Sequence, residues 1–176
     1  MRRHRDHAFI RGSPLRDACR WAHGCRMGFA LHSSAVEDGS PIPRAYSHDR
    51  GDVSPPLSWD GVPDEAVELV LIVDAPDAPI KGSFVHWVVF GLDPSRHGLA
   101  LGENPPEASS GANGFGTAGY LGPAPPRGDR AHHYVFRLLA LDDSMRLSGL
   151  PSYADVAGAT EGHVLAEARL IGTYQR

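Results

Sequence analysis

The stretch GFGTAGYLGPAPPRGDRAHHYVFRLLALD, residues 114–142, joins a loop rich in glycine and proline to a strongly apolar segment. From residue 131 the segment fits a β-strand, in which successive side chains point to opposite faces. One face then carries His132, Tyr134, Phe136, Leu138 and Ala140, and the other carries His133, Val135, Arg137 and Leu139. Because His132 and Tyr134 share a face beside a loop whose prolines restrict its course, they predict the rim of a small polar or anionic binding site. A purely structural boundary between core and solvent is the alternative.

Two apolar segments upstream predict further strands of the same core. Residues 66–73 alternate with a period of two and lead into the turn DAPDAP, residues 74–79, which holds two carboxylates and two prolines. Residues 83–92 are apolar on both faces, as in a central strand. Strict alternation places His86 on the face opposite Trp87.

His86 needs a hydrogen-bond partner in such a strand, because an unpaired polar group in the core costs about 1–3 kcal/mol. A carboxylate of the neighbouring turn, Asp77 or Asp74, is one candidate partner. A backbone carbonyl in a purely structural role is the other. The sequence leaves this choice open.

The C-terminal part predicts one helix and one further strand. A helix is expected to start near Ser152 and to cover residues 153–159, with Gly162 able to end it. Residues 166–174 alternate as in a strand, although residues 163–170 also fit a helix. Strands joined by proline-rich connections, with one late helix, favour a mainly antiparallel β-domain.

Length and composition indicate one globular domain that follows a basic head. The chain has 176 residues, of which 41% are hydrophobic and 22% charged. Residues 1–27 hold seven arginines and two aspartates, a charge of +5, so the remainder carries −9 of the total of −4. An acidic body argues against nucleic acid as a partner. We expect residues 1–27 to be a poorly ordered extension or an upstream start, and residues 28–176 to form the domain.

The sequence carries no clear signature of membrane insertion or of a common catalytic motif. The head lacks an apolar stretch long enough for a signal peptide or a transmembrane span, which predicts a cytoplasmic protein. Both cysteines, Cys19 and Cys25, lie in the head, so the domain has no thiolate site or disulfide. Residues 114–119 match the dinucleotide pattern G-x-G-x-x-G, but prolines follow where that motif opens a helix.

Five groups of residues, taken in order, resemble the phosphatidylethanolamine-binding protein family, in its bacterial and archaeal Raf-kinase-inhibitor-like branch. They are VSPPLSW (53–59), DAPDAP (74–79), HWVV (86–89) with GYLGPAPP (119–126), HHYVF (132–136), and GHVLAEA (162–168) with LIGTY (170–174). The resemblance covers roughly residues 28–176 and implies an antiparallel Greek-key β-sandwich with a short C-terminal helix and peripheral helical turns. It also implies a small pocket at one end for phosphate-like or acetate-like anions.

The resemblance assigns this pocket residue by residue. The resemblance places the family's acidic turn at Asp77 and Pro79, and the histidine of its His-Trp strand at His86. It places the family's proline loop at Pro125 and Pro126, and the polar residues of its later strand at His132 and Tyr134. The family's turn usually begins with an aspartate, where this chain has Ala75 next to Asp74. Asp74 is included as a candidate, but neighbours on an extended segment point to opposite sides, so it needs a local twist to replace the missing carboxylate. Loss of that charge should weaken the hold of His86 on its proton.

These observations predict a non-enzymatic protein with a regulatory role that binds a small anion, such as phosphate, acetate or a phosphorylated head group. An imidazolium, a tyrosine hydroxyl and loop N–H groups would hold the anion, and rigid prolines would lower the entropy cost of binding. No cofactor, metal or nucleic acid is expected. The prokaryotic members of the family suggest a homodimer, and the sequence indicates no particular protein partner.

Two other functions stay open. A small hydrolase could use His86, His132 and Asp77 as acid–base groups or as metal ligands, although no nucleophile is evident and no H-x-H or H-x-x-x-H spacing occurs. A protease- or kinase-inhibitor-like interaction module, acting through its loops, has no residue signature in the sequence.

Overall fold

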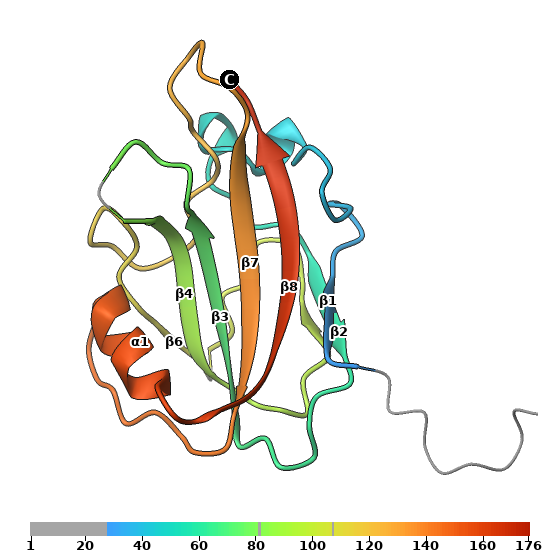
Figure 1. The fold of residues 1–176 in the computed structure, drawn as a ribbon, viewed down its shortest axis with the longest axis vertical. Coiled ribbons are helices and arrows are strands. Elements are labelled where there is room, and N and C mark those ends of the chain that lie inside the picture. The colour runs from blue at the N-terminus through green and yellow to red at the C-terminus, as the bar shows by residue number, and fades with distance from the viewer. Residues whose placement is uncertain (1–27, 81, 107) are drawn as a thin grey trace, which may run out of the picture.

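The computed structural model describes residues 28–80, 82–106 and 108–176, so the predicted N-terminal extension lies outside the described residues. Two antiparallel sheets enclose a common core (Figure 1). The elements are β1 (Ala30–His32), η1 (Arg44–Tyr46), η2 (His48–Arg50), β2 (Leu57–Asp60), β3 (Glu68–Ala75), β4 (Phe84–Leu92), β5 (Gly98–Leu99), β6 (Ser109–Ser110), β7 (His132–Leu141), α1 (Tyr153–Thr160) and β8 (Val164–Tyr174). The prediction of a mainly β fold with a short late helix and peripheral helical turns is confirmed.

The larger sheet has the strand order β6-β4-β3-β7-β8, and the smaller one has the order β1-β2-β5. β7 pairs with β8 along its whole length, from His132 opposite Tyr174 to Leu141 opposite Val164. This pairing decides the C-terminal segment in favour of a strand. A short isolated helix would be marginal in water, whereas the strand satisfies its backbone and buries Ala168 and Leu170 in the core.

The main core lies between the two sheets. Tyr134, Phe136 and Leu138 of β7 are buried there, together with Trp59 of β2 and Trp87 of β4. The predicted alternation of β7 is therefore confirmed. A second cluster lies on the other side of the larger sheet and consists of Val70, Ile72, Val85, Val88, Phe90, Leu139, Leu141 and Val156. Because β3 and β4 are covered on both sides, they read as continuous apolar runs in the sequence.

α1 covers part of this second cluster and begins at the predicted cap. The Ser152 hydroxyl accepts a hydrogen bond from the Asp155 N–H, and the Asp155 carboxylate accepts one from the Ser152 N–H, which forms a capping box. Val156 is fully buried against the sheet. Gly162, with φ of +82°, follows the helix and permits the sharp change of direction into β8.

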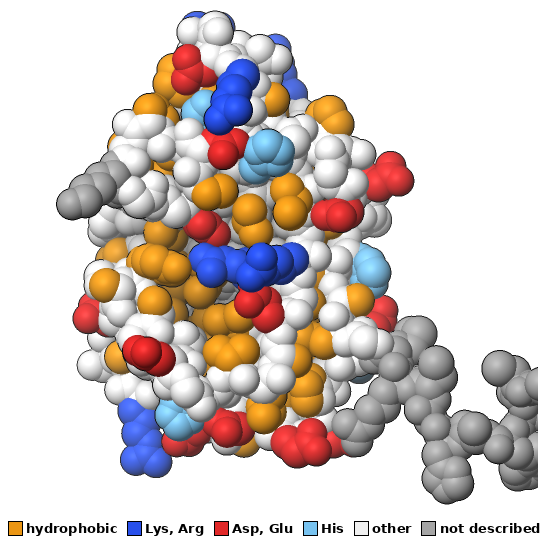
Figure 2. All heavy atoms as spheres, viewed as in Figure 1, with side chains coloured by type: hydrophobic (Ala, Val, Ile, Leu, Met, Phe, Trp, Pro, Cys, Tyr) orange, Lys and Arg blue, Asp and Glu red, His pale blue; other side chains and the backbone are white. Residues whose placement is uncertain are grey.

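The part of the larger sheet that α1 leaves uncovered carries ion pairs. Arg137 of β7 lies opposite Arg169 of β8. Arg137 donates to Asp74 at 3.0 Å, and Arg169 donates to Glu167 at 2.5 Å. Figure 2 shows a band of basic side chains across this face, with acidic and apolar side chains above and below it. The band therefore consists of paired charges on an otherwise partly apolar face.

Candidate functional site

A cavity of about 200 Å³ opens at one end of the sandwich. The turn after β3, the beginnings of β4 and β7, and the loop that precedes β7 meet there. Six of the predicted site residues line it, namely Pro79, His86, Pro125, Pro126, His132 and Tyr134. The fold thus brings together residues from three separate parts of the sequence.

A β-bulge directs His86 into this cavity. β3 and β4 pair Val73 with Trp87 and Asp74 with Val85, which leaves His86 as the extra residue on β4. Such a bulge breaks the strict alternation of side chains. The imidazole of His86 consequently lies on the inner side of the sheet, with its ring centroid 5.0 Å from that of Tyr134. The prediction that His86 faces away from the side of Trp87 is wrong, because alternation assumes a strand without a bulge.

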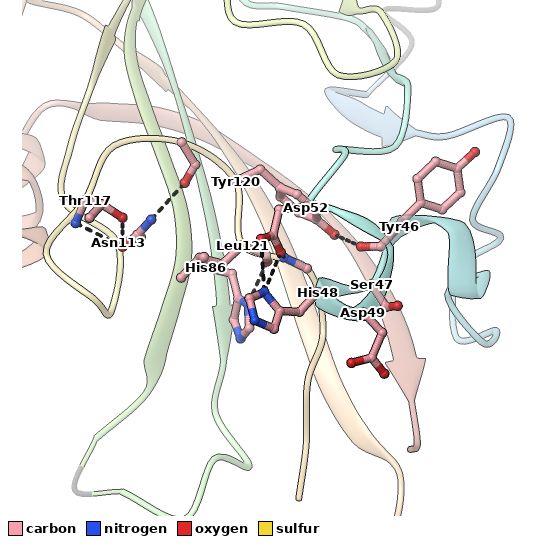
Figure 3. A network of polar contacts seen from close by, with 12 residues as sticks. Tyr46, Ser47, His48, Asp49, Asp52, His86, Asn113, Thr117, Tyr120 and Leu121 are labelled. Atoms are coloured by element: carbon pink, nitrogen blue, oxygen red, sulfur yellow. Dashed lines mark hydrogen bonds and ion pairs between the residues drawn. The ribbon is translucent and has the colours of Figure 1, made fainter.

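The partner of His86 is a backbone carbonyl. Its Nδ1 donates a hydrogen bond to the Leu121 oxygen at 2.8 Å (Figure 3). Burial lowers the pKa of His86 below its usual 6.5, and the Leu121 hydrogen bond and the charges of Asp74 and Asp52 oppose this effect. The ring is therefore neutral at neutral pH. Since Nδ1 carries the hydrogen, Nε2 is the nitrogen that can accept a proton or a hydrogen bond.

His132 and Tyr134 supply the polar groups of β7. Both side chains are buried, and His132 Nε2 lies 3.5 Å from a carboxylate oxygen of Asp129. Burial raises the pKa of Tyr134 to about 12, so its hydroxyl keeps its proton at neutral pH. A protonated hydroxyl can donate to an anion. His132 and Tyr134 both lie in the cavity wall because they share one face of β7, as the sequence predicted.

The two predicted acidic residues are held by other partners. Asp77 accepts hydrogen bonds from the backbone N–H of His133 at 3.1 Å and from its Nδ1 at 2.6 Å. This interaction lowers the pKa of Asp77. Asp74 accepts from Arg137, and from the Ser83 hydroxyl at 2.5 Å. Neither carboxylate is part of the cavity wall, whereas Ala75 is. Asp74 thus does not replace the acid that the family pattern has at position 75.

Aromatic and aliphatic side chains form the mouth of the cavity. The Phe84 ring lies edge-on to His86, with 5.0 Å between centroids, and edge-on to Phe115 at 5.5 Å. Phe115 and Ile80, which also line the cavity, are 68% and 51% exposed. The wall is therefore polar at His86 and Tyr134 and apolar toward solvent.

One residue of the wall, His48, was missed by sequence reasoning. It reaches the cavity from η2, next to the loop that also contacts His86. The two segments are in close contact, because a Cβ atom on Gly122 would lie 2.4 Å from the His48 backbone nitrogen. In Figure 3 the Tyr120 hydroxyl donates to the Tyr46 carbonyl beside this contact, at 3.2 Å. The segment around His48 is irregular, so no alternation of apolar and polar residues indicates which way its side chains point. The spacing of His48 and Asp52, just before the VSPPLSW motif, was the available signal.

In the parts of the chain that the structure describes, no three His, Cys, Asp or Glu side chains are grouped so that they could hold a metal ion. The proposed triad of His86, His132 and Asp77 is not formed, since Asp77 is bound to His133. A catalytic zinc site needs about three such ligands around one point.

Comparison with known proteins matches the family described as "Phosphatidylethanolamine-binding protein" to residues 32–175. The UPF0098 protein of Methanothermobacter thermautotrophicus is 49% identical over 153 residues, which are 83% of this chain and 98% of the relative. The UPF0098 protein of Aquifex aeolicus is 43% identical over 154 residues, 83% of this chain and 88% of the relative.

Solved structures show the same similarity. The phosphatidylethanolamine-binding protein homolog CT736 of Chlamydia trachomatis has a TM-score of 0.79 and 39% identity, covering 85% of this chain and 98% of its own. Escherichia coli YbcL, described as a member of the mammalian PEBP family, has a TM-score of 0.80 and 28% identity, covering 84% of this chain and 98% of its own. Both structures therefore share the fold of this chain over most of its length.

Proposed function

Because this chain belongs to the phosphatidylethanolamine-binding protein family, we propose that it is a non-enzymatic protein whose cavity binds a small anion, such as phosphate, acetate or a phosphorylated head group. The observation that carries this proposal is the convergence of His86 and Tyr134, whose ring centroids are 5.0 Å apart, with His132 in the wall of one cavity. We further propose that binding serves a regulatory role.

The chemistry of the wall supports an anionic ligand. The Tyr134 hydroxyl is a donor, and His86 Nε2 becomes one when the ring takes up a proton. A bound anion would favour that protonation, because it interacts with the charged ring and offsets the cost of burial. Pro125 and Pro126 also line the cavity, and their fixed φ angles reduce the ordering that binding requires.

The arrangement favours binding over hydrolysis. An acid–base site built on His86 and His132 would need the carboxylate of Asp77, which instead accepts two hydrogen bonds from His133. A neutral His86 with its Nδ1 fixed by Leu121 is suited to hydrogen-bond a ligand.

NMR titration with inorganic phosphate tests the proposal. We expect the ring signals of His86 and His132 to shift, and His86→Ala to weaken the response at least about tenfold, because it removes a charge-assisted hydrogen bond. His163→Asn is the matched control, since His163 also pairs with an acid, Asp142 at 2.9 Å, but is not part of the cavity wall. An unchanged phosphate response in His86→Ala would reject the site.

We also propose a cytoplasmic location and a homodimer. Within the described residues, no helix is long and apolar enough to cross a membrane. LppC of Mycobacterium tuberculosis, a relative 40% identical over 149 residues, bears a lipoprotein name, so the cytoplasmic location remains a proposal that cell fractionation can check. The homodimer expected from the family is tested by the mass of the protein in solution.

A further inference from the structure

The turn that brings His48 to the cavity ends in a strained residue. Asp52 has φ of +56° and is the only non-glycine residue with a positive φ in the described part of the chain. Left-handed backbone costs a residue with a Cβ atom on the order of 1 kcal/mol, and such residues often lie at functional sites. Some other interaction must hold Asp52 in this conformation.

Its carboxylate makes the contacts that hold it there. Both oxygens lie 3.0 Å from Nδ1 of His48, and Oδ1 also accepts a hydrogen bond from the Gly122 N–H at 2.8 Å (Figure 3). The hydrogen bond from Gly122 would be enough to attach the turn to the loop. The contact between Asp52 and His48 is therefore not needed for that attachment, and an exposed pair of this kind contributes little to stability. Its effect is to orient the His48 ring.

The contact with Asp52 fixes the chemistry of the His48 ring. A carboxylate only accepts hydrogen bonds, so Nδ1 of His48 carries the hydrogen and Nε2 is left for another partner. His86 is fixed in the same way, because its Nδ1 donates to the Leu121 carbonyl. Both histidines line the same cavity. Two imidazoles therefore line one cavity with Nδ1 already bonded, and each can donate to an anion from Nε2 when the ring carries a second proton.

We propose that His48, oriented by Asp52, is a second imidazole that contacts the bound anion, and that it makes the cavity selective for a phosphomonoester over a carboxylate. The inference rests on the proposed function of the cavity. A phosphomonoester presents three terminal oxygens, so it can engage His86, Tyr134 and His48 together. A carboxylate presents only two oxygens, which His86 and Tyr134 already satisfy. Asp52 also supplies negative charge near His86. This matters because the residue at position 75 of the cavity wall is alanine and carries no charge.

Binding of inorganic phosphate and of acetate to the full chain, measured by NMR titration, tests this role. We expect His48→Asn to weaken phosphate binding by about 10- to 100-fold, the effect of one hydrogen bond to a charged group, and acetate binding by less than about threefold. Phenyl phosphate should follow inorganic phosphate. His163→Asn should change neither affinity, because His163 lies outside the cavity wall.

Asp52→Asn separates orientation from folding. Asparagine also tolerates left-handed backbone, and its amide oxygen can still accept from the Gly122 N–H. With its oxygen kept on the Gly122 N–H, its amide nitrogen takes the place of Oδ2, 3.0 Å from His48 Nδ1, and as a donor there it favours the ring hydrogen on Nε2. We expect ¹⁵N NMR to show this change of tautomer. The preference for phosphate over acetate should fall at nearly unchanged stability, because the ring then meets the anion as a neutral donor and no longer as an imidazolium paired with a carboxylate.

The three variants separate the role of His48 from the proposed function of the cavity. If His48→Asn binds phosphate as the wild type does while His86→Ala does not, the role of His48 is overturned and the proposed function stands. If His86→Ala also binds phosphate normally, the proposed function itself fails. If Asp52→Asn changes the His48 tautomer but keeps the selectivity, Asp52 does not act through His48.

Discussion

Gly122→Ala should disrupt both the stability of the domain and its candidate site. A Cβ atom at this position would lie 2.4 Å from the His48 nitrogen and from the Ser47 carbonyl carbon, and 2.6 Å from the Tyr46 oxygen. All three are backbone atoms, which cannot rotate away as a flexible side chain can. Since contacts of carbon with other heavy atoms normally begin near about 3.5 Å, the loop must move by roughly 1 Å.

That movement has a definite cost. It breaks or lengthens the hydrogen bond from the Gly122 N–H to Asp52, now 2.8 Å, and the one from the His48 N–H to the Pro123 oxygen, now 3.3 Å. A hydrogen bond to a charged group contributes about 1.5–3 kcal/mol, and overpacking costs about 1–3 kcal/mol. We therefore expect the free energy of unfolding to fall by about 3–5 kcal/mol. Because Leu121 moves too, phosphate binding should weaken.

Urea denaturation of the wild type and of Gly122→Ala measures this loss, provided that the slope against denaturant is unchanged. Gly158→Ala is the matched control. Nothing lies within 4 Å of a Cβ atom there, and Gly158 is in α1, so the change should stabilise by about 0.5–1 kcal/mol. A loss below about 1 kcal/mol in Gly122→Ala, with normal phosphate binding, would refute the close packing of the two segments.

Three further changes test other parts of the structure. Burial lowers the pKa of His86 below 6.5, so on acidification the unfolded chain takes up a proton at this residue before the folded chain does. The free energy of unfolding should therefore fall as the pH drops below about 6.5. Denaturation at several pH values should show a smaller fall in His86→Asn. Arg137→Met leaves the Asp74 carboxylate, only 10% exposed, without its ion-pair partner and should cost about 2–3 kcal/mol in urea denaturation, most of which Asp74→Val in the same chain should restore. Ser152→Ala removes the capping box of α1 and should lower the melting temperature through a loss of about 1 kcal/mol; an unchanged temperature would show that the cap is dispensable.

Much of the fold could be predicted because its signals are local. The alternation from His132 to Ala140 gave the correct inner face of β7, and Ser152 with Gly162 bounded the helix. The C-terminal segment was ambiguous between strand and helix, because that choice depends on the hydrogen bonds offered by β7 rather than on the segment itself.

The site was predictable only where its residues follow a regular pattern. The positions of His132 and Tyr134 follow from strand alternation, but that of His86 depends on a bulge, which appears only when β4 is paired with β3. The two acids of the turn were expected near His86, yet their partners, His133 and Arg137, lie on a strand distant in the sequence.

The sequence by itself determined the antiparallel strands, the late helix and the family, because these depend on residue patterns along the chain. The tertiary structure alone decided which side chains meet at the cavity. His48 joins His86 there because Gly122 allows two irregular segments to touch, and Asp52 connects them. Such contacts depend on how segments far apart in the chain pack against each other, and a local sequence pattern does not show which distant segments come into contact.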